Sequence, residues 1–567
     1  MKFEDLFDEV GGFGRFQVIV LLMLCSPRLF LPWNFLLHNF LSAVPPHHCQ
    51  LTAQDLLNLT QEDRLLAAIP KEEGGSLSAC KMYSTPQLYN STETLRQHNQ
   101  SMIVGCQNGW EYNQSQFTST LATEWDLVCD NRSLNEAATT IFFVGVMLGA
   151  LLFGYLSDKF GRRRMLLLAL LCTALFGMLS SFSTSYLMFA VTRFLCGVGL
   201  TGMSIISIIL TVEWTDMEHR TLVAVMSSLT WSVGNMFLAL IAYLIRDWRW
   251  LLFTVTTPSL IAAAVCWWIP ESARWLLANG KTEEAQVSLW KCAKMNKRRV
   301  CQPGLSIEAL RKVIKTDKSD KQYSFWHLLK TPKMRKLTLC SGVVWLGVSF
   351  SYYAISFSIG GFGLDMYLTQ FIFGAIEVPA KLISYVLLDR VGRRRCQGWY
   401  LIATGLLMTF TLFISKEQRI LQLVFAILAK GCSEGAFTTA FLYTAELYPT
   451  VLRQTGLGYT SFMARLAASL TPMIKLLDVY WVALPPILFI IFSASSGGVA
   501  FLLPETSNVP LPETIDHIEH PRYLDAMNCE RLAVTKNRFA AKTEIESEAE
   551  NCEEESCLNN EESSDVK

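Results

Sequence analysis

The sequence predicts an all-α membrane protein with twelve spanning helices, arranged as two six-helix halves that run in parallel. Composition is the first ground: of 567 residues, 51% are hydrophobic and only 17% are charged, whereas soluble domains carry about 25% charged residues. Apolar segments of roughly 20 residues, each enough to cross a bilayer core of about 30 Å, recur along the chain. Three short motifs also occur twice at a nearly constant spacing, which indicates an internal duplication.

The expected spanning segments form two groups of six, one within residues 16–269 and one within 337–503. The segments are residues 16–41, 137–156, 165–182, 186–210, 222–245, 250–269, 337–359, 367–388, 398–414, 421–443, 456–477 and 482–503. Outside them lie an N-terminus at 1–15, a loop at 43–134, a central loop at 270–336 and a tail at 504–567.

The basic residues predict the orientation, because loops rich in Lys and Arg stay in the cytoplasm. Residues 270–336 hold sixteen Lys and Arg against six acids. The loop at 43–134 holds five basic residues and ten acids. We therefore expect this loop outside the cell, and the central loop and both termini in the cytoplasm.

The loop at 43–134 carries two further signs of an extracellular location. Its N-x-S/T sequons predict glycosylation, and its four cysteines predict two disulfides in an oxidising space. The sequence does not choose among the three pairings of four cysteines. A fifth sequon, at Asn131, lies close to the next helix and is the least favoured. The predicted sites are glycans on Asn58, Asn90, Asn99 and Asn113, and disulfides among Cys49, Cys80, Cys106 and Cys129.

The tail is acidic. Its last 24 residues hold ten acids and one base, Lys567. This composition predicts disorder from residue 504 onward and makes the tail a candidate binding segment for cytoplasmic partners.

The duplication is specific. GYLSDKFGRRR at 154–164 recurs as YVLLDRVGRRR at 385–395, an offset of 231 residues. An acid followed seven residues later by arginine recurs with an offset of 233, and Pro-Glu-Ser at 270–272 recurs as Pro-Glu-Thr at 504–506. Parallel repeats of this kind alternate access to a central site by rocking one half against the other.

The duplicated acids and arginines lie at the inner membrane edge, where carboxylate–guanidinium pairs can hold one conformational state. The alternative is that the arginines only anchor the topology. The candidate gating residues are Asp158, Arg162, Glu213, Arg220, Asp389, Arg393, Glu446 and Arg453.

At these motifs the chain resembles the major facilitator superfamily, over essentially the whole membrane region. The sequon-bearing loop and PESARWL at 270–276 resemble its organic ion transporter branch. ATEWDLVCD at 122–130, FGAIEVPAKL at 373–382 and AELYPTVLRQTGLG at 445–458 resemble the organic anion transporters. LIRDWRWLL at 244–252 and GVSFSYY at 347–353 are most similar to the type 2 subtype. The resemblance implies a multi-pass plasma membrane protein, on the basolateral face of epithelial or liver cells.

Ionisable residues inside spanning segments are costly unless they are paired or face water, so each is a functional candidate. Arg465 has no acid at helical spacing, and its planar guanidinium matches a carboxylate or phosphate. The alternative is an arginine held by helix carbonyls or by an acid on another helix. Resemblance also assigns a basic residue here to anion transporters, whereas cation-carrying relatives have an acid.

The other intramembrane cations are less clear. Resemblance matches Lys381 to a lysine of the family's substrate cavity, although Glu377, four residues earlier, competes for it. Lys430 has the same spacing from Glu434, and we expect Lys430 and Arg193 to be structural or gating. Arg28 lies between two prolines and forms either a second cationic patch or a side chain that snorkels to the interface.

Aromatic side chains can hold the flat apolar body of an organic anion. Trp345, Tyr352 and Tyr353 lie near one face of the seventh segment. Phe437 lies on the tenth segment and Trp231 on the fifth, and resemblance assigns these two, Trp345 and Tyr353 to the cavity wall. The alternative is that they pack in the core or face lipid.

By resemblance, the expected function is secondary transport of cyclic GMP and other nucleotides, orotate, salicylate, prostaglandins or dicarboxylates, in exchange for an intracellular dicarboxylate. The chain has no GxxxxGK[ST] motif, which excludes ATP as the direct driver. It also has no metal-spaced His/Cys cluster, so we expect neither an enzyme nor a cofactor. The expected partners are organic anions, a counter-anion and the bilayer, but no nucleic acid.

Two alternatives remain open. A carrier of organic cations or zwitterions would depend on Glu377 and Glu434. A receptor or adaptor would use the extracellular loop and the acidic tail, but would not need gating motifs in both halves.

Overall fold

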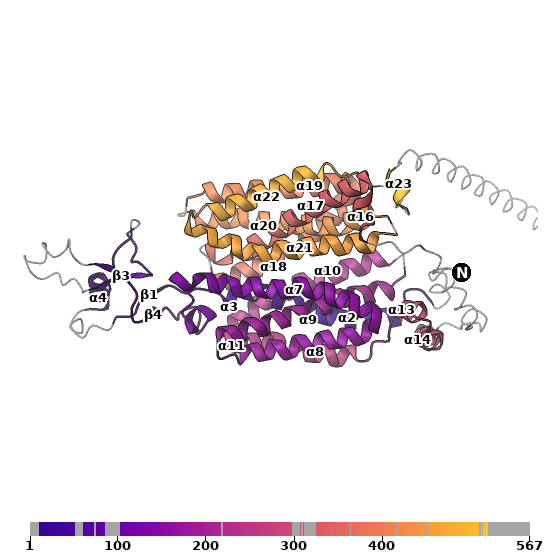
Figure 1. Ribbon diagram of the computed structural model, residues 1–567, viewed down its shortest axis with the longest axis horizontal. Coiled ribbons are helices and arrows are strands. Elements are labelled where there is room, and N and C mark those ends of the chain that lie inside the picture. The colour runs from indigo at the N-terminus through magenta and orange to yellow at the C-terminus, as the bar shows by residue number, and fades with distance from the viewer. Residues whose placement is uncertain are drawn as a thin grey trace, which may run out of the picture.

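A computed structural model describes residues 11–51, 60–72, 75–84, 102–216, 219–297, 307, 310, 325–362, 365–415, 418–449, 451–507, 509, 512 and 514–519. Within them the helices form one bundle with a small loop region at one end (Figure 1). The predicted sites Asn58, Asn90 and Asn99 and the acidic residues after 519 lie outside the described residues.

Six spans form the first half. The sixth is broken at Thr257, because Pro258 cannot donate a backbone hydrogen bond. The spans are α2 (Arg15–Leu36) with α3 (His38–Leu41), α7 (Arg132–Phe160), α8 (Arg162–Ser181), α9 (Tyr186–Glu213), α10 (Arg220–Leu244), and α11 (Trp248–Thr256) with α12 (Pro258–Cys266).

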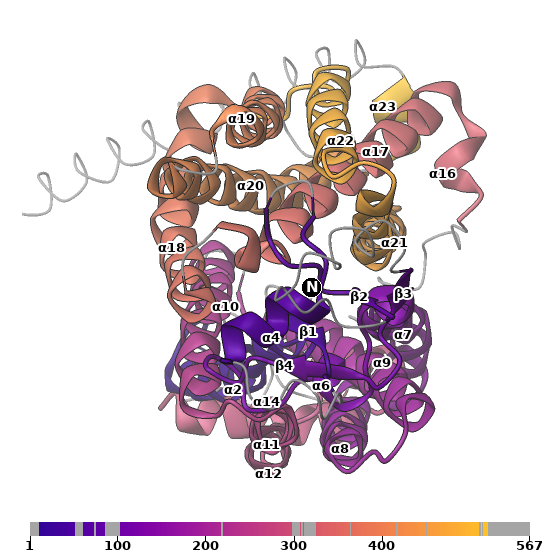
Figure 2. The ribbon, with the colours of Figure 1, turned by 90° about the vertical axis from the view of Figure 1, so that its left-hand side faces the viewer.

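Six further spans form the second half, which lies beside the first (Figure 2). Ten of the twelve are long and apolar enough to cross a membrane by themselves; the more polar α21 and the 17-residue α22 complete the set. This confirms the predicted fold class. The spans are α17 (Pro332–Ser356), α18 (Met366–Val391) after η3 (Ile359–Phe362), α19 (Arg393–Phe413), α20 (Arg419–Leu447), α21 (Arg453–Lys475) with η4 (Leu476–Val479), and α22 (Leu484–Ala500).

The loop after α3 folds beyond the bundle end (Figure 1). It contains two antiparallel strand pairs, β1 with β4 and β2 with β3. Disulfides join Cys49 to Cys106 and Cys80 to Cys129, so the four predicted cysteines are bonded and one of the three pairings is selected. The elements are β1 (His47–Cys49), α4 (Gln61–Ala68), β2 (Lys81–Tyr83), β3 (Ile103–Gly105), β4 (Trp110–Tyr112), α6 (Leu121–Glu124) and η2 (Cys129–Asn131).

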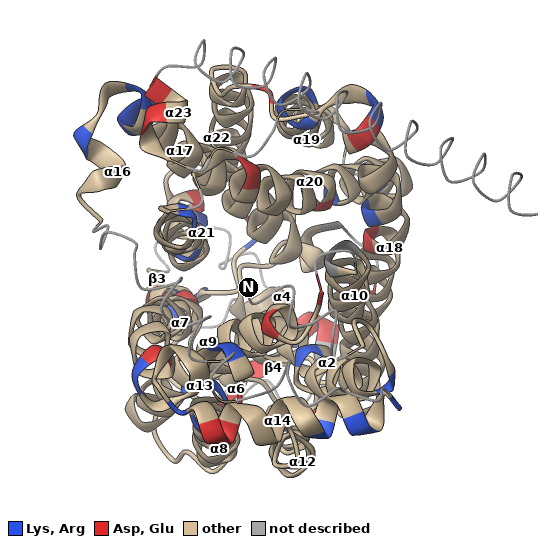
Figure 3. Cartoon of the chain, turned by 90° about the vertical axis from the view of Figure 1, so that its right-hand side faces the viewer, with Lys and Arg blue, Asp and Glu red and all other residues tan. Residues whose placement is uncertain are grey.

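The opposite end carries four short helices and many charged helix ends (Figure 3). The helices are α13 (Ala273–Ala278), α14 (Thr282–Met295), α16 (His327–Lys330) and α23 (Ile515–Glu519).

Helix α23 corrects the expectation of disorder from residue 504. Its isoleucines, Ile515 and Ile518, pack against the core of the second half, and Glu519 accepts the backbone N–H groups of Lys333 (2.9 Å) and Met334 (3.2 Å) at the start of α17. Burial alone would raise the pKa of Glu519, but hydrogen bonds, including these two, and the charge of Lys333 outweigh it and lower that pKa. Composition missed this segment because it averages over the whole tail, whereas a few residues make contacts with a helix far away in the sequence.

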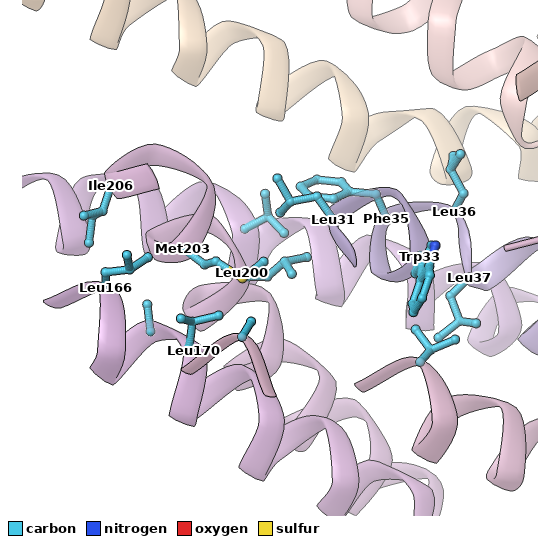
Figure 4. Close-up of a cluster of buried hydrophobic side chains, with 14 of the residues drawn as sticks. Leu31, Trp33, Phe35, Leu36, Leu37, Leu166, Leu170, Leu200, Met203 and Ile206 are labelled. Atoms are coloured by element: carbon cyan, nitrogen blue, oxygen red, sulfur yellow. The ribbon is translucent and has the colours of Figure 1, made fainter. Parts of the chain in front are cut away.

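The helices of the first half pack with their backbones close together. In its core, leucine side chains of α8 pack against leucine, methionine and isoleucine side chains of α9, and α2 packs against α9 further along (Figure 4). Where α7 crosses α9, a Cβ added at Gly149 would lie 2.5 Å from the carbonyl oxygen of Val198. Small residues allow helices to approach in this way in membranes.

We expect Gly149→Val to lower the unfolding temperature of the detergent-purified protein, because overpacking a helix crossing costs about 1–3 kcal/mol. Gly154→Val is the matched control on the same helix, since a Cβ there meets no atom within 4 Å. Equal unfolding temperatures for the two variants would contradict the packing described.

Candidate functional site

Two lysines and two glutamates meet halfway along α18 and α20, and they pair across the helices. Lys381 Nζ lies 3.2 Å from a Glu434 oxygen, and Lys430 Nζ lies 3.1 Å from a Glu377 oxygen. Within one helix, Lys381 and Glu377 are 3.9 Å apart. All four residues are at least 95% buried. Glu377 is therefore a weaker competitor for Lys381 than expected, and Glu434 is its main partner.

Helix α10 of the first half closes over this tetrad of Glu377, Lys381, Lys430 and Glu434. Lys381 Nζ donates to Ser232 Oγ (2.7 Å) and to the carbonyl oxygen of Ser228 (2.9 Å). The hydroxyl of Ser232 donates to Glu377 (3.0 Å), and Asn235 Nδ2 donates to Glu377 from 3.4 Å. The tetrad is thus both the charge centre of the second half and a contact between halves.

Arg465 lies at the middle of α21 and is half-buried. Its Nη1 donates to the hydroxyl (2.6 Å) and the carbonyl oxygen (3.0 Å) of Ser461 on its own helix. Among the described residues, no carboxylate lies within 4 Å of it. The sequence left open that Arg465 is held by a helix carbonyl or by an acid on another helix. A carbonyl of its own helix does hold part of the guanidinium, whereas no acid on another described helix does. Tyr353 interacts electrostatically with both Arg465 and Glu434.

Two more arginines inside the first half have no carboxylate partner in the described part of the chain. Arg28 on α2 is half-buried, and its Nε has no hydrogen-bond acceptor there. Arg193 on α9 is fully buried, stacks on Phe142 at 4.4 Å and contacts His38 Nε2 at 3.2 Å.

The predicted aromatic residues form one connected layer. Trp231 Nε1 donates to the Tyr352 hydroxyl across the two halves (3.1 Å), and that hydroxyl donates to Glu377 (2.9 Å). Tyr352 packs on Tyr353 and on Phe437, with ring centroids 5.3 and 5.4 Å apart. Trp345 packs on Phe437 (5.6 Å) and donates to Thr444, about two turns further along α20.

The duplicated motifs make the same contacts twice. Arg162 pairs with Asp158 and with Glu213, the latter at 3.4 Å. Arg393 pairs with Asp389 at 3.6 Å and with Glu446 at 3.1 Å. Each arginine therefore ties the second, third and fourth spans of its own half together in this state.

The glutamates of the second motif, Glu213 and Glu446, pair with Arg162 and Arg393 of the first motif. The side chain of Arg220 lies outside the described atoms. Arg453 is half-buried at the start of α21.

The Pro-Glu-Ser and Pro-Glu-Thr motifs also have a shared role. The carboxylate of Glu271 accepts the backbone N–H groups of Arg162 and Arg163 at the start of α8. Glu505 does the same for Arg393 and Arg394 at the start of α19. A carboxylate at a helix N-terminus satisfies free N–H groups and opposes the helix dipole.

A glycine makes room for each of these carboxylates. Gly161 and Gly392 have φ angles of +104° and +93°, and a Cβ would lie 2.6 and 2.7 Å from the glutamate oxygens. The sequence analysis quoted these motifs but did not foresee this cap.

The halves are joined at the end that carries the loop. Arg132 on α7 pairs with Asp478 (2.6 Å), and Lys475 on α21 lies 4.0 Å from a carboxylate oxygen of Glu136 on α7. Asn39 donates to the Ser356 carbonyl (2.8 Å) and to Gln370 (3.1 Å). In the described ranges, side-chain hydrogen bonds and ion pairs between the halves extend from this end to the tetrad, and none reaches the Arg162 and Arg393 motifs.

Of the predicted glycosylation sites, Asn113 is exposed directly after β4, and Asn131 is exposed at the start of α7. Sequence reasoning missed the polar face of α10. Its signal was the spacing of Ser228, Ser232 and Asn235 by four and three residues on an apolar helix, which places them on one face.

A twelve-span duplicated bundle with a buried charge centre and the same charged motifs in both halves defines a transporter of the major facilitator superfamily. Residues 86–516 match the family described as Sugar (and other) transporter. The inward-open xylose transporter XylE from E. coli superposes with a TM-score of 0.57 at 16% identity, over 87% of this chain and 98% of XylE. That likeness shows the fold alone.

The chain belongs to solute carrier family 22, in its organic anion transporter branch. It is 47% identical to solute carrier family 22 member 7 from Homo sapiens over 529 residues, 92% of this chain and 96% of the relative. It is 40% identical to member 6 from Danio rerio, over 94% and 96% of the two chains. The resemblance predicted from the sequence is confirmed: the protein is a multi-pass plasma membrane transporter and not an enzyme.

We expect Lys381→Ala and Glu434→Ala to be non-additive in unfolding free energy, because each single change leaves a buried charge without its main partner. The double variant should be at least about 1 kcal/mol more stable than the sum of the single effects. Lys430 and Glu434, which have helical spacing but no ion pair within 4 Å, form the control cycle with a smaller coupling. A larger coupling energy for Lys430 and Glu434 than for Lys381 and Glu434 would mean that the ion pairs form within each helix.

Proposed function

We propose that this protein carries small organic anions across the plasma membrane by alternating access, in exchange for an intracellular dicarboxylate. The anions expected are compact and planar or bear a flat ring, such as salicylate, orotate and cyclic nucleotides. Arg465 holds the anionic group, and the layer of Trp231, Tyr352, Tyr353 and Phe437 holds the apolar body.

One observation carries the choice of anions: the balance of charge in the middle of the bundle. Glu377 and Glu434 each have a lysine within 3.2 Å. Arg28, Arg193 and Arg465 have no carboxylate within 4 Å among the described residues. A membrane interior with excess positive charge attracts anions and repels cations.

Arg465 is the best placed of the three arginines. It lies at the middle of its span within electrostatic reach of Tyr353, and among the described residues only its own helix accepts hydrogen bonds from it. Its guanidinium has five N–H donors, of which Ser461 engages those on one nitrogen. A carboxylate or phosphate can therefore bind the remaining donors without displacing a protein partner. Arg28 remains a candidate for a second anionic group.

The same unpaired guanidinium supports exchange. When the site closes, water leaves and an uncompensated charge costs several kcal/mol. A bound anion lowers that cost whichever way the carrier changes its conformation. The carrier therefore returns to its starting state faster with a counter-anion bound than when it is empty.

The contacts between halves support alternating access with the loop-bearing end closed. That end faces outward in the topology that the basic residues predict. Opening it must break the bonds of Asn39, Arg132 and Lys475. The exposed pair of Arg132 and Asp478 contributes about 1 kcal/mol at most, so the buried amide of Asn39 holds the closed state more strongly.

The alternatives have less support. A cation carrier would need a free acid, but lysines hold both Glu377 and Glu434. A receptor would not require Arg162 and Arg393 to make duplicate contacts in each half.

We expect Arg465→Gln to reduce uptake of labelled salicylate by roughly tenfold or more at equal surface expression, the size expected for a lost hydrogen bond to a charged group. Arg465→Lys should retain part of the uptake because it keeps the charge. The control is Arg419→Gln, which removes an exposed arginine at the start of α20. Unchanged salicylate kinetics in Arg465→Gln would remove Arg465 from the site.

We expect Asn39→Ala to open the loop-bearing end more than Arg132→Ala does. Loss of the buried amide leaves a carbonyl and Gln370 unsatisfied, at about 1–3 kcal/mol, so the open population should rise roughly tenfold. Spin labels at Leu187 and Phe413, both exposed at this end, would report the change as a longer distance. A larger effect of Arg132→Ala would assign the closed state to the surface ion pair.

A further inference from the structure

A polar cavity lies in the loop region, outside the tetrad and the aromatic layer. Its volume is about 690 Å³, within the range of roughly 300–1,000 Å³ typical of small-ligand sites. Its walls include Trp110 and Tyr112 of β4, Phe117, and Glu124 of α6. Asn113, the first residue after β4, stands in the same wall. A predicted glycosylation site therefore opens directly onto a preformed cavity.

The Asn113 side chain is held in a fixed orientation. Its backbone N–H donates to the Pro46 carbonyl (2.9 Å), which ties it to the start of β1. Its side-chain Oδ1 accepts the backbone N–H of Ser115 (2.8 Å), the third residue of the sequon. This turn engages the oxygen and leaves the amide nitrogen Nδ2, the atom that a glycan modifies, exposed.

Trp110 supplies the second observation. Its indole Nε1 is buried and has no hydrogen-bond acceptor among the described atoms. Buried Trp N–H groups usually have a partner, because leaving one unsatisfied costs about 1–3 kcal/mol. The ring lines the cavity and offers it a flat apolar face, and a rotation of the side chain would bring this donor to an acceptor there.

A pyranose ring fits both features, since it has hydroxyl oxygens that accept and a C–H face that packs on aromatic rings. We propose that the first N-acetylhexosamine of an N-linked glycan on Asn113 occupies this cavity, with Trp110 donating to a sugar oxygen. The proposal rests on the extracellular orientation of the loop, not on the identity of the transported anion.

The covalent step uses a lipid-linked oligosaccharide pyrophosphate as the donor. Asn113 Nδ2 forms a bond to the anomeric carbon, the bond from that carbon to the pyrophosphate oxygen breaks, and Nδ2 loses one proton. The sugar is then tethered beside the cavity, so it binds at a high effective concentration.

The bound sugar would brace the loop against the membrane domain. Glu124, on the far wall, accepts from Trp248 Nε1 (2.6 Å) and pairs with Arg249, both on α11. The Thr118 backbone N–H donates to the Arg246 carbonyl (3.1 Å) at the end of α10. The cavity thus lies where the loop meets the first half.

The test uses full-length protein in which the other four sequon asparagines are changed to Gln, so that Asn113 alone carries a glycan. We expect the amidase PNGase F to release this glycan at least tenfold more slowly from native than from denatured protein. Trp110→Ala should raise the native release rate by about tenfold, and Trp110→Phe should lie between. Native release that is equally fast with and without Trp110, or an unmodified Asn113, would overturn the proposal.

A control chain that retains only Asn58 should show no effect of Trp110→Ala on glycan release. If Trp110→Ala fails to fold, the unfolding temperature provides the second measurement. Ser115→Ala, which abolishes the sequon, should lower the unfolding temperature of the protein that keeps Trp110, and should lower it less in Trp110→Phe, which keeps a ring face but not the N–H donor. An equal decrease in both backgrounds would also overturn the proposal, whereas salicylate uptake tests only the transport function.

Discussion

The pairing of charge inside a low-dielectric bundle is the constraint on which the rest of the structure depends. Glu377, Lys381, Lys430 and Glu434 are buried where an isolated charge would cost several kcal/mol, and each has a partner on the neighbouring helix. Because the tetrad is neutral, the surplus positive charge of the interior belongs to arginines. The selectivity that we propose is therefore a difference between paired and unpaired cations, not a count of basic residues.

The same electrostatic logic organises the ends of the spans, where backbone N–H groups and side-chain charges meet. In each half an arginine binds two acids, and a third acid caps the helix that carries that arginine. These contacts lie within a half and make it a rigid unit. The bonds that must change during transport are those between halves, at the loop-bearing end and along α10 and α18.

Much of this could be predicted from the sequence. Hydropathy and the offset motifs gave twelve spans in two halves, and the isolated position of Arg465 on its helix was evident from spacing alone. The pairing of Lys381 with Glu434 could not be predicted. Spacing of i, i+4 points to Glu377 on the same helix, whereas the Lys381 Nζ atom lies closer to Glu434 on the neighbouring helix. The polar residues of α10 were missed because Ser and Asn barely alter the hydropathy of an apolar segment. Composition predicted a disordered tail and could not reveal that two isoleucines and Glu519 hold its beginning against α17.

One contact between the halves has an evolutionary consequence. Lys381 binds the backbone carbonyl of Ser228, not its hydroxyl. Any amino acid that preserves the helix supplies that oxygen, so position 228 can drift freely while the bond persists. Covariation between homologues would leave this one bond invisible, although the neighbouring bond to the Ser232 hydroxyl depends on the side chain.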